Sequence, residues 1–352
     1  MAPYRVQQNR WHVILATTLA IGTFGCSLLP RQDASPELTD APPEPKEDTS
    51  QSERFTFSLN FKAGTKTRYQ VTTEAVTAIG NAQTAIQGNS PTAILPKVSE
   101  LSEVVFTQEI LGPLPEDVNT AVALITINQV KYIRTSPGQP DLIFTNQEPA
   151  DQNSPFAKLI GQTYTIEINP LGYVPGVFNL RPARLAVRGP SEAHAAALDL
   201  VSPPAIFPRH GFFSLPGPDA GSPAVGDLWK GVQQYTLRAP GTNMDPLGTH
   251  RFEKTYQLQS VRRQPVGTIA EIVFEGSPII RMTEDGQPAD VPFLSCSYAG
   301  AGEFNLDAGR IEGYLEHLEV RMPLPQTESP PDDEGSIIIA TRSCWVQRLD
   351  LN

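Results

Sequence analysis

The side chains that could do chemistry are scattered singly along this sequence. Beyond the N-terminal segment the histidines are His194, His210, His250 and His317, and none has the spacing of a metal ligand set or a catalytic pair. The chain also lacks the Gly-x-Ser-x-Gly, His-Glu-x-x-His, Gly-Lys-Ser/Thr and Cys-x-x-Cys motifs. We therefore predict a protein without catalytic residues, cofactor or metal. A hydrolase would require the fold to bring two carboxylates, or a serine and a histidine, together in a pocket.

A run of carboxylates near the C-terminus is the one candidate for a cation site. Glu328, Asp332, Asp333 and Glu334 could bind Ca²⁺ through oxygen ligands. The run lacks the alternating ligand spacing of an EF-hand loop and lies among prolines. We predict instead a solvated loop that joins the last two strands.

Cys26 follows a short apolar run, and its position indicates a lipid attachment site. Two arginines precede the stretch from Val13 to Gly25, which has 13 residues and no charge. A membrane-spanning helix needs about 20 apolar residues, so this length fits the core of a secretory signal instead. The segment resembles a bacterial lipoprotein signal, which is cleaved before a cysteine that then carries a diacylglycerol. The resemblance implies a signal peptide at 1–25 and an anchor in membrane lipid through acylated Cys26.

Two other readings of this segment remain open. The chain could be secreted after cleavage near Ala20 or Gly22, or could keep the apolar run as an uncleaved anchor. Ser27 follows the cysteine where Asp would favour inner-membrane retention in many Gram-negative bacteria, so an outer-membrane location is slightly favoured. We expect a lipid-anchored protein of the cell envelope, on its periplasmic or surface side.

Residues 26–53 are predicted to be a disordered tether. The tract is rich in Pro, Ser, Asp and Glu and has no aromatic residue, so it cannot bury enough apolar surface to offset the entropy of ordering. The whole chain has a formal net charge of −11 and no Lys/Arg-rich block. Because pairing with phosphate dominates nucleic-acid binding, we exclude nucleic acid as a partner.

The remainder of the chain is predicted to be mainly β. Glycine (26) and proline (34) together make about 17% of the 352 residues, against a usual level of about 12%. Apolar and polar residues alternate in "RFTFSLNF" (54–61), "YTIEIN" (164–169) and "HRFEKTYQL" (250–258), which is the pattern of antiparallel strands with one buried face. Asn169 to Gly172 have the residue order of a type I hairpin turn. The stretch 310–322 also has helical spacing, but Gly313 and the preceding turn favour a strand.

The order of these features divides the chain into two related halves. The first β half is 54–179 and the second is 225–352, and two facing sheets or a partly open barrel would fit them. Residues 180–224 contain one short helix near 190–201, followed by a Pro/Gly-rich connection. Phe207, Phe212 and Phe213 of this connection either fill the core between the halves or line the mouth of an apolar groove.

Cys296 and Cys344 are candidates for a disulfide, which export would permit. If 292–307, 310–322 and 336–350 pair in order, the two cysteines lie on the first and third strands. They are then separated by two strand spacings of about 4.8 Å plus an offset along the strands, beyond the ~7 Å Cα limit of a disulfide. Two buried thiols are therefore the favoured reading.

Three stretches together resemble a family of exported bacterial lipoproteins whose shared domain has no assigned function. They are "LNFKAGTKTRYQVTTE" (59–74), "LIGQTYTIEINPLGYVPGV" (159–177) and "VGDLW" (225–229). The family's usual order is a Lys-x-Gly…Tyr strand pair, a Gly-x-x-x-x-Ile-x-x-x-Gly-x-Val hairpin and then Gly-Asp-x-Trp, and the three stretches stand in this order. The resemblance implies an envelope location and a mostly β fold, and it supplies no catalytic or binding residue.

Two functions fit these observations. The first is a membrane-anchored envelope module that is not an enzyme and that binds an envelope protein or a cell-wall component, or serves a structural role. The second is a carrier of a hydrophobic, lipid-like ligand held in a cleft between the β halves.

Overall fold

The computed structural model describes residues 53–81, 95–114, 117, 119–217, 220–238, 246–280, 293–323 and 336–351. The chain from Arg54 onward forms one compact unit. The predicted signal, lipidated Cys26, nearly all of the tether and the carboxylates of the 328–334 loop lie outside the described residues.

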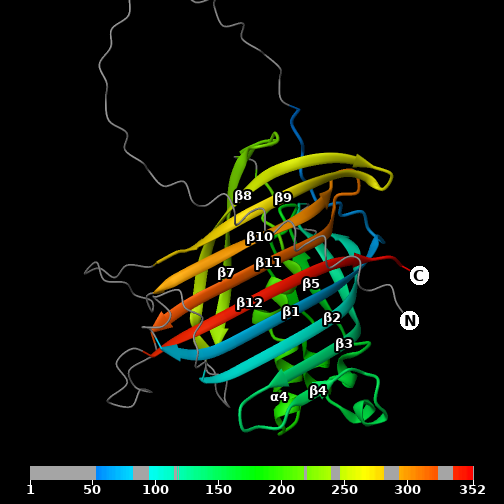
Figure 1. Cartoon of the computed structure of the whole chain (residues 1–352). Coiled ribbons are helices and arrows are strands. Elements are labelled where there is room, and N and C mark those ends of the chain that lie inside the picture. Colours follow the sequence, from blue (N-terminus) through cyan, green and yellow to red (C-terminus); the bar gives the residue numbers. More distant parts are fainter. Residues whose placement is uncertain are drawn as a thin grey trace, which may run out of the picture. The chain divides into compact units, whose positions relative to one another are not determined.

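The unit is built on a single antiparallel sheet of twelve strands (Figure 1). The strands run β6-β5-β3-β2-β1-β12-β11-β10-β9-β8-β7 across the sheet, with β4 paired to β3. Their bounds are β1 Lys66–Asn81, β2 Leu95–Pro113, β3 Ala121–Thr135, β4 Leu142–Phe144, β5 Thr163–Ile168, β6 Val177–Phe178, β7 Leu228–Arg238, β8 Pro246–Gln264, β9 Gly267–Pro278, β10 Ser295–Asn305, β11 Arg310–Pro323 and β12 Ser336–Leu349. The prediction of a mainly antiparallel β fold is confirmed.

Alternation of side chains explains why these segments are strands. In β5 the alternate residues Tyr164, Ile166 and Ile168 are buried, while the residues between them are not. The ambiguous stretch 310–322 is strand β11, in which burial alternates except at the four consecutive buried residues 313–316. The turn from Asn169 to Gly172 is closed by a 3.0 Å bond from the Gly172 N–H to the Asn169 carbonyl, as its residue order predicts.

The two predicted halves join edge to edge in this sheet rather than facing one another as separate sheets. Strands β1 to β6 spread outward from the centre on one side, and β12 back to β7 spread outward on the other. The long pairing of β1 with β12, from Arg68↔Leu349 to Asn81↔Ser336, makes the junction. In the described residues the edge strands β6 and β7 are not paired, so the sheet remains open along one seam.

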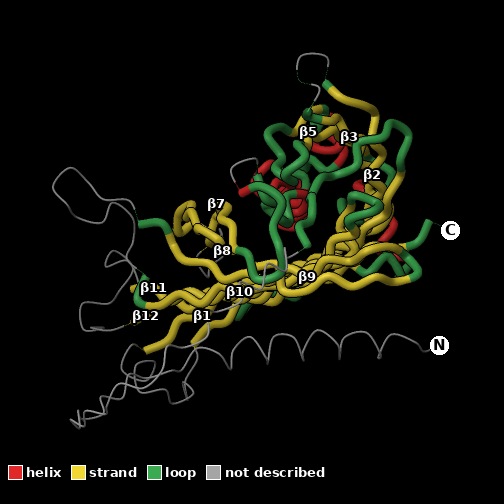
Figure 2. Tube along the Cα trace, turned by 90° about the horizontal axis from the view of Figure 1, so that it is seen from above, coloured by secondary structure: helices red, strands yellow, loops and turns green. Residues whose placement is uncertain are grey.

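Helices and irregular segments cover one face of the sheet, which we call the inner face (Figure 2). They are the 3₁₀ helices η1 Pro149–Asn153 and η2 Ala157–Leu159 and the α-helices α3 Arg181–Ala186, α4 Glu192–Leu200 and α5 Pro203–His210. Helix α4 is the predicted short helix; Ser191 caps its N-terminus. Helix α5 contacts both edge strands, β6 and β7, and thus closes the seam between them.

Two segments differ from the sequence prediction. Residues 54–61 alternate like a strand, yet apart from an isolated bridge between Arg54 and Ala224 they form no ladder. This extended segment packs on the inner face, where Phe57 contacts the rings of Trp229 and Phe304. The start of the predicted Pro/Gly-rich connection is helical, because Pro203 and Pro204 stand in the first turn of α5, where a missing N–H costs nothing.

Candidate functional site

Three charged side chains lie on the inner face of the second half, at positions where strand alternation places apolar residues. Lys254 of β8 stands between Phe252 and Tyr256, and its side chain is 0% exposed. Glu316 of β11 is 3% exposed and Arg342 of β12 is 17% exposed. We call these three residues the charged cluster.

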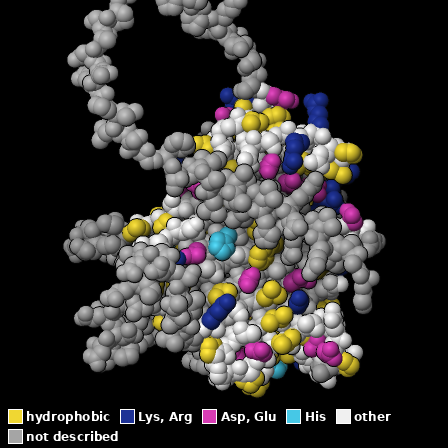
Figure 3. All heavy atoms as spheres, in the orientation of Figure 1, with side chains coloured by type: hydrophobic (Ala, Val, Ile, Leu, Met, Phe, Trp, Pro, Cys, Tyr) yellow, Lys and Arg dark blue, Asp and Glu magenta, His cyan; other side chains and the backbone are white. Residues whose placement is uncertain are grey.

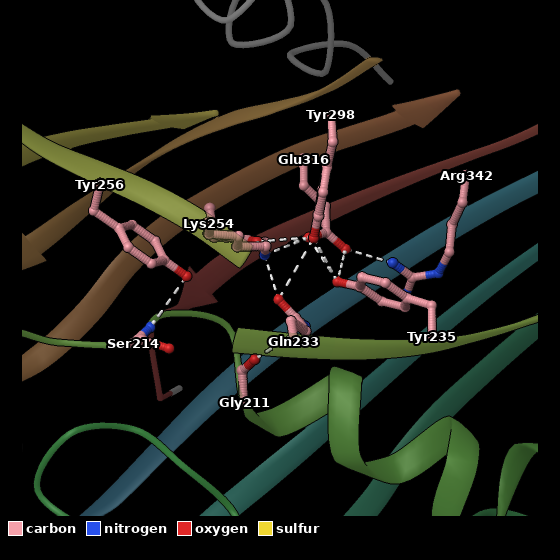
Figure 4. A network of polar contacts seen from close by, with 10 residues as sticks. Gly211, Ser214, Gln233, Tyr235, Lys254, Tyr256, Tyr298, Glu316 and Arg342 are labelled. Atoms are coloured by element: carbon pink, nitrogen blue, oxygen red, sulfur yellow. Dashed lines mark hydrogen bonds and ion pairs between the residues drawn. The ribbon is translucent and has the colours of Figure 1, made fainter. Parts of the chain in front are cut away.

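The Glu316 carboxylate is the centre of the charged cluster (Figure 4). The Lys254 ammonium lies 3.1 Å from Glu316 Oε2, and the Arg342 guanidinium donates to Oε1. Three tyrosine hydroxyls also donate to the carboxylate: Tyr235 at 2.8 and 2.9 Å, Tyr298 at 2.7 Å and Tyr314 at 2.7 Å. Five donors thus contact the two oxygens of one carboxylate. A buried carboxylate needs such partners, because an unpaired charge away from water is costly.

Aromatic rings enclose the Lys254 ammonium. Its Nζ lies 4.3 Å from the centre of the Phe274 ring and 4.7 Å from that of Tyr298, within cation–π range. It also donates to the Tyr314 hydroxyl at 2.9 Å. Gly300, the cross-strand partner of Glu316, makes room for this enclosure, since a Cβ there would lie 2.3 Å from the Phe274 ring.

Burial and mutual attraction set the protonation of the charged cluster. Desolvation lowers the pKa of Lys254 to about 8, although Glu316 opposes the shift. Desolvation alone would raise the pKa of Glu316, but Lys254, Arg342 and the tyrosine hydroxyls outweigh it and hold the pKa well below its usual range. At pH 7 the cluster therefore contains two cations and one anion.

This geometry fits a network of polar contacts that holds the strands together better than it fits a reactive site. The charged cluster and its tyrosines join β7, β8, β10, β11 and β12. Lys254 and Glu316 are sealed from solvent, and their polar atoms are engaged with one another and with the tyrosines. A substrate would have to displace these contacts before it could meet either group.

Folding stability is expected to rise between pH 8 and 10 through Lys254. The pKa of this group is about 8 in the folded chain, against 10.5 for an unperturbed lysine, so the unfolded chain binds more protons in that window. The cost of burying the charged amine is complete below pH 8 and is relieved as the pH rises. Urea unfolding should show wild type gaining about 2 kcal/mol relative to Lys254→Met from pH 8 to 10. A difference independent of pH would contradict the lowered pKa.

A second polar group lies where α5 closes the seam. The Tyr164 hydroxyl of β5 is 2.8 Å from His210 Nε2, and Arg209 Nη1 donates to the Leu200 carbonyl at the end of α4. Tyr164, Arg209 and His210 are 1%, 7% and 5% exposed. Burial, together with the charge of Arg209, holds the pKa of His210 well below 6.5, so its imidazole is neutral at pH 7.

The phenylalanines predicted for a groove or a core plug have different surroundings. Phe212 and Phe213 are buried on the inner face, with ring centres 5.8 and 5.0 Å from that of Tyr314. Phe212 also contacts Tyr69 of β1, so it touches both halves. Phe207 of α5 is 39% exposed. The structure thus brings two of the three side chains together and leaves the third at the seam.

The two cysteines are free thiols. Cys296 on β10 pairs with Val320 on β11, which in turn pairs with Ala340 on β12, four residues from Cys344. Two strand spacings and an offset of about 13 Å along the strand therefore separate them. This separation follows from the strand order that the sequence predicted, in which 292–307, 310–322 and 336–350 pair in turn.

A thiol titration checks this placement. In a Cys26→Ser chain unfolded without reductant, a thiol reagent should count two cysteines. In the folded chain Cys344 should react very slowly, because it is 1% exposed and burial raises the pKa of its thiol to about 11. A count of zero in the unfolded chain would reveal a disulfide.

The remaining histidines lie apart from the charged cluster. His194 bonds to Ser191 at the start of α4, and His250 is buried on β8. His317 Nδ1 lies 2.8 Å from Ser343 Oγ on the opposite, outer face of the sheet. That face carries charged side chains of both signs among apolar ones (Figure 3). Within the described residues no third side chain is recorded against the Ser343–His317 pair, and no group of His, Cys, Asp and Glu is placed to hold a metal ion.

Sequence reasoning missed the charged cluster although a signal was present. The alternation in 250–258 places Lys254 on the same face of its strand as Phe252 and Tyr256. The alternation in 310–322 likewise places Glu316 on the same face of its strand as Tyr314 and Leu318. A charge at an apolar position of a strand requires a buried partner of opposite sign. Which strands supply that partner depends on the sheet order.

None of the helices in the described residues is long and apolar enough to cross a membrane. No model of a known protein family matches the chain, and no curated protein matches its sequence. Among solved structures, one described as "lipid-protein interactions in lipovitellin" is similar with a TM-score of 0.44 and 11% identity. The match covers 83% of this chain and 26% of that one, so this chain spans about a quarter of its length. A likeness of this size carries no argument about function.

Proposed function

We propose that this chain is a lipid-anchored module of the cell envelope that binds a partner and catalyses no reaction. The observation that carries the proposal is the sealed charged cluster: Lys254 and Glu316 are 0% and 3% exposed and contact one another. These two charged groups therefore stabilise the fold rather than react with a substrate. Recognition of a partner would then take place on the surface of the unit. The partner would be an envelope protein or a cell-wall component.

The cellular location in this proposal rests on the sequence. A 13-residue apolar run before Cys26, a tether over 26–53 and three stretches that resemble exported lipoproteins all support export and acylation. Two or three acyl chains hold a protein stably on a membrane, whereas a single chain is marginal. The tether would then hold the β unit away from the bilayer.

Detergent phase partition tests the anchor. The wild-type chain, expressed with its signal in a bacterium that processes lipoproteins, should enter the detergent phase. Cys26→Ser should move to the aqueous phase, and Cys296→Ser, a matched cysteine in the β unit, should partition as the wild type does. Equal partition of wild type and Cys26→Ser would contradict lipidation.

A second candidate function is the carriage of a hydrophobic ligand, and one observation favours it. The inner face is lined with aromatic rings, and Phe212 and Phe213, which fill it, belong to a segment outside any helix or strand. The segment is held by a bond from the Leu215 N–H to the Leu171 carbonyl at 2.9 Å and by bonds with the side chains of Trp229, Tyr256 and Gln233, none of which belongs to a strand ladder. An alkyl chain could replace the two rings without breaking a strand ladder.

Native mass spectrometry of the full chain tests the carrier. The chain would be extracted in mild detergent and incubated with oleyl alcohol, an uncharged ligand with a long alkyl chain. The carrier function predicts a species with one alcohol bound per chain. An absence of any bound species would contradict it and leave the non-catalytic binding module.

A further inference from the structure

The seam between β6 and β7 is the place where the curled sheet could open at least cost. The described residues of these two strands share no backbone ladder, and α5 lies between them in contact with both. Movement of α5 would therefore disrupt side-chain packing but no strand pairing. Phe178 of β6 and Phe207 of α5 expose 48% and 39% of their surface at this seam, so its rim is apolar.

Just inside the rim, α5 presents a buried positive charge. Arg209 is 7% exposed. Among the described residues no ion pair between Arg209 and a carboxylate is recorded. Its recorded partners are both neutral: the Leu200 carbonyl at the C-terminus of α4, at 2.9 Å, and the Tyr164 hydroxyl. A helix end contributes only about half a charge, so the guanidinium is incompletely compensated.

His210 adds an unused hydrogen-bonding atom beside this charge. Its Nε2 is engaged with the Tyr164 hydroxyl, while its Nδ1 is buried and has no hydrogen-bond partner in the part of the chain that the structure describes. In the tautomer whose Nε2 accepts the tyrosine proton, Nδ1–H is a buried donor without an acceptor. Leaving such a donor unpaired is costly, and an anionic oxygen would satisfy it.

We propose that Arg209 and His210 bind the carboxylate of a long-chain fatty acid whose alkyl chain takes the place of Phe212 and Phe213. One guanidinium matches the single negative charge of a carboxylate and its paired oxygens. Only Gly211 separates the two polar residues from Phe212 and Phe213, so head group and chain would occupy adjoining parts of the inner face. The inference rests on the carrier function and adds to it the class of ligand and the residues that select it.

Paired ligands separate this inference from the carrier function itself. Oleic acid and oleyl alcohol have the same chain and differ in the head group. The full chain should bind the acid at least about tenfold more tightly than the alcohol by titration calorimetry. Arg209→Gln should lose this preference, because it weakens binding of the acid far more than binding of the alcohol, and Arg209→Lys should retain part of it. Arg184→Gln, at an exposed arginine of α3, is the matched control and should bind both ligands as the wild type does.

Each contrary outcome has a distinct meaning. Equal affinities of the wild-type chain for acid and alcohol would overturn the head-group site and leave the carrier function intact. An acid preference unchanged in Arg209→Gln would also overturn the site. Binding of neither ligand would overturn both. If Arg209→Gln does not fold, the wild-type preference and the Arg209→Lys variant decide.

Discussion

Replacing Glu316 with Gln is expected to lower the free energy of unfolding by about 3–5 kcal/mol, the range for breaking a buried ion pair by removing one partner. The amide leaves Lys254 and Arg342 on the inner face without an anion. Lys254 can respond by losing its proton, since its pKa is already lowered to about 8. Arg342 cannot, because a guanidinium keeps its proton.

Urea unfolding followed by circular dichroism measures this effect, and Glu319→Gln is its matched control. Glu319 lies on the same strand but on the outer face, where it pairs with Arg321, and both side chains are 34% exposed. An exposed pair contributes at most about 1 kcal/mol. Equal effects of the two substitutions would mean that the charged cluster does not stabilise the fold.

Replacing Phe213 with Ala is expected to cost about 3–5 kcal/mol, the usual range for removing a buried aromatic ring. The ring is 3% exposed and lies against Tyr314 and Tyr256. It also lies on the bare backbone of Gly302 in β10, where a Cβ would come within 2.0 Å of Phe213 Cζ. The Phe213 ring can pack against β10 at this point because Gly302 has no side chain.

A double-mutant cycle tests this contact. Gly302→Ala alone should cost about 1–3 kcal/mol through overpacking. In a Phe213→Ala background the cost should be smaller, because only the approach of the new Cβ to the Gly313 carbonyl oxygen, at 2.8 Å, remains. Gly80→Ala is the control, since its new Cβ would meet only Ile339 and Ile337 side chains at 3.4 Å or more. Additive costs at Phe213 and Gly302 would contradict the contact.

Strand positions were predictable from sequence where the alternation is strict and one face is buried. Tyr164, Ile166 and Ile168 identify β5, and the Asn169 turn follows from local residue chemistry. The same pattern at 54–61 gave a wrong strand, because side chains alternate in any extended segment that packs on a surface. Whether a ladder forms depends on an available edge, which local sequence does not encode.

The arrangement of the strands was not predictable from sequence. The junction of the halves is a pairing between β1 and β12, which stand at opposite ends of the described chain. No local pattern specifies such a partner. The charged cluster depends on this arrangement, since Tyr235, Lys254 and Glu316 meet only when their strands lie near one another in the sheet. The seam closed by α5 depends on it as well.

Amine labelling of the folded chain tests most directly whether the charged cluster serves the fold rather than a reaction. An accessible lysine with a pKa of about 8 would react faster than ordinary surface lysines, because more of it is unprotonated at pH 7.5. Lys230 on the adjacent strand β7 is the internal comparison, with a side chain 65% exposed. Peptide mapping after brief acetylation should find Lys230 modified and Lys254 untouched until the chain is unfolded. Modification of Lys254 ahead of Lys230 in the folded chain would contradict a sealed cluster and reopen the case for catalysis.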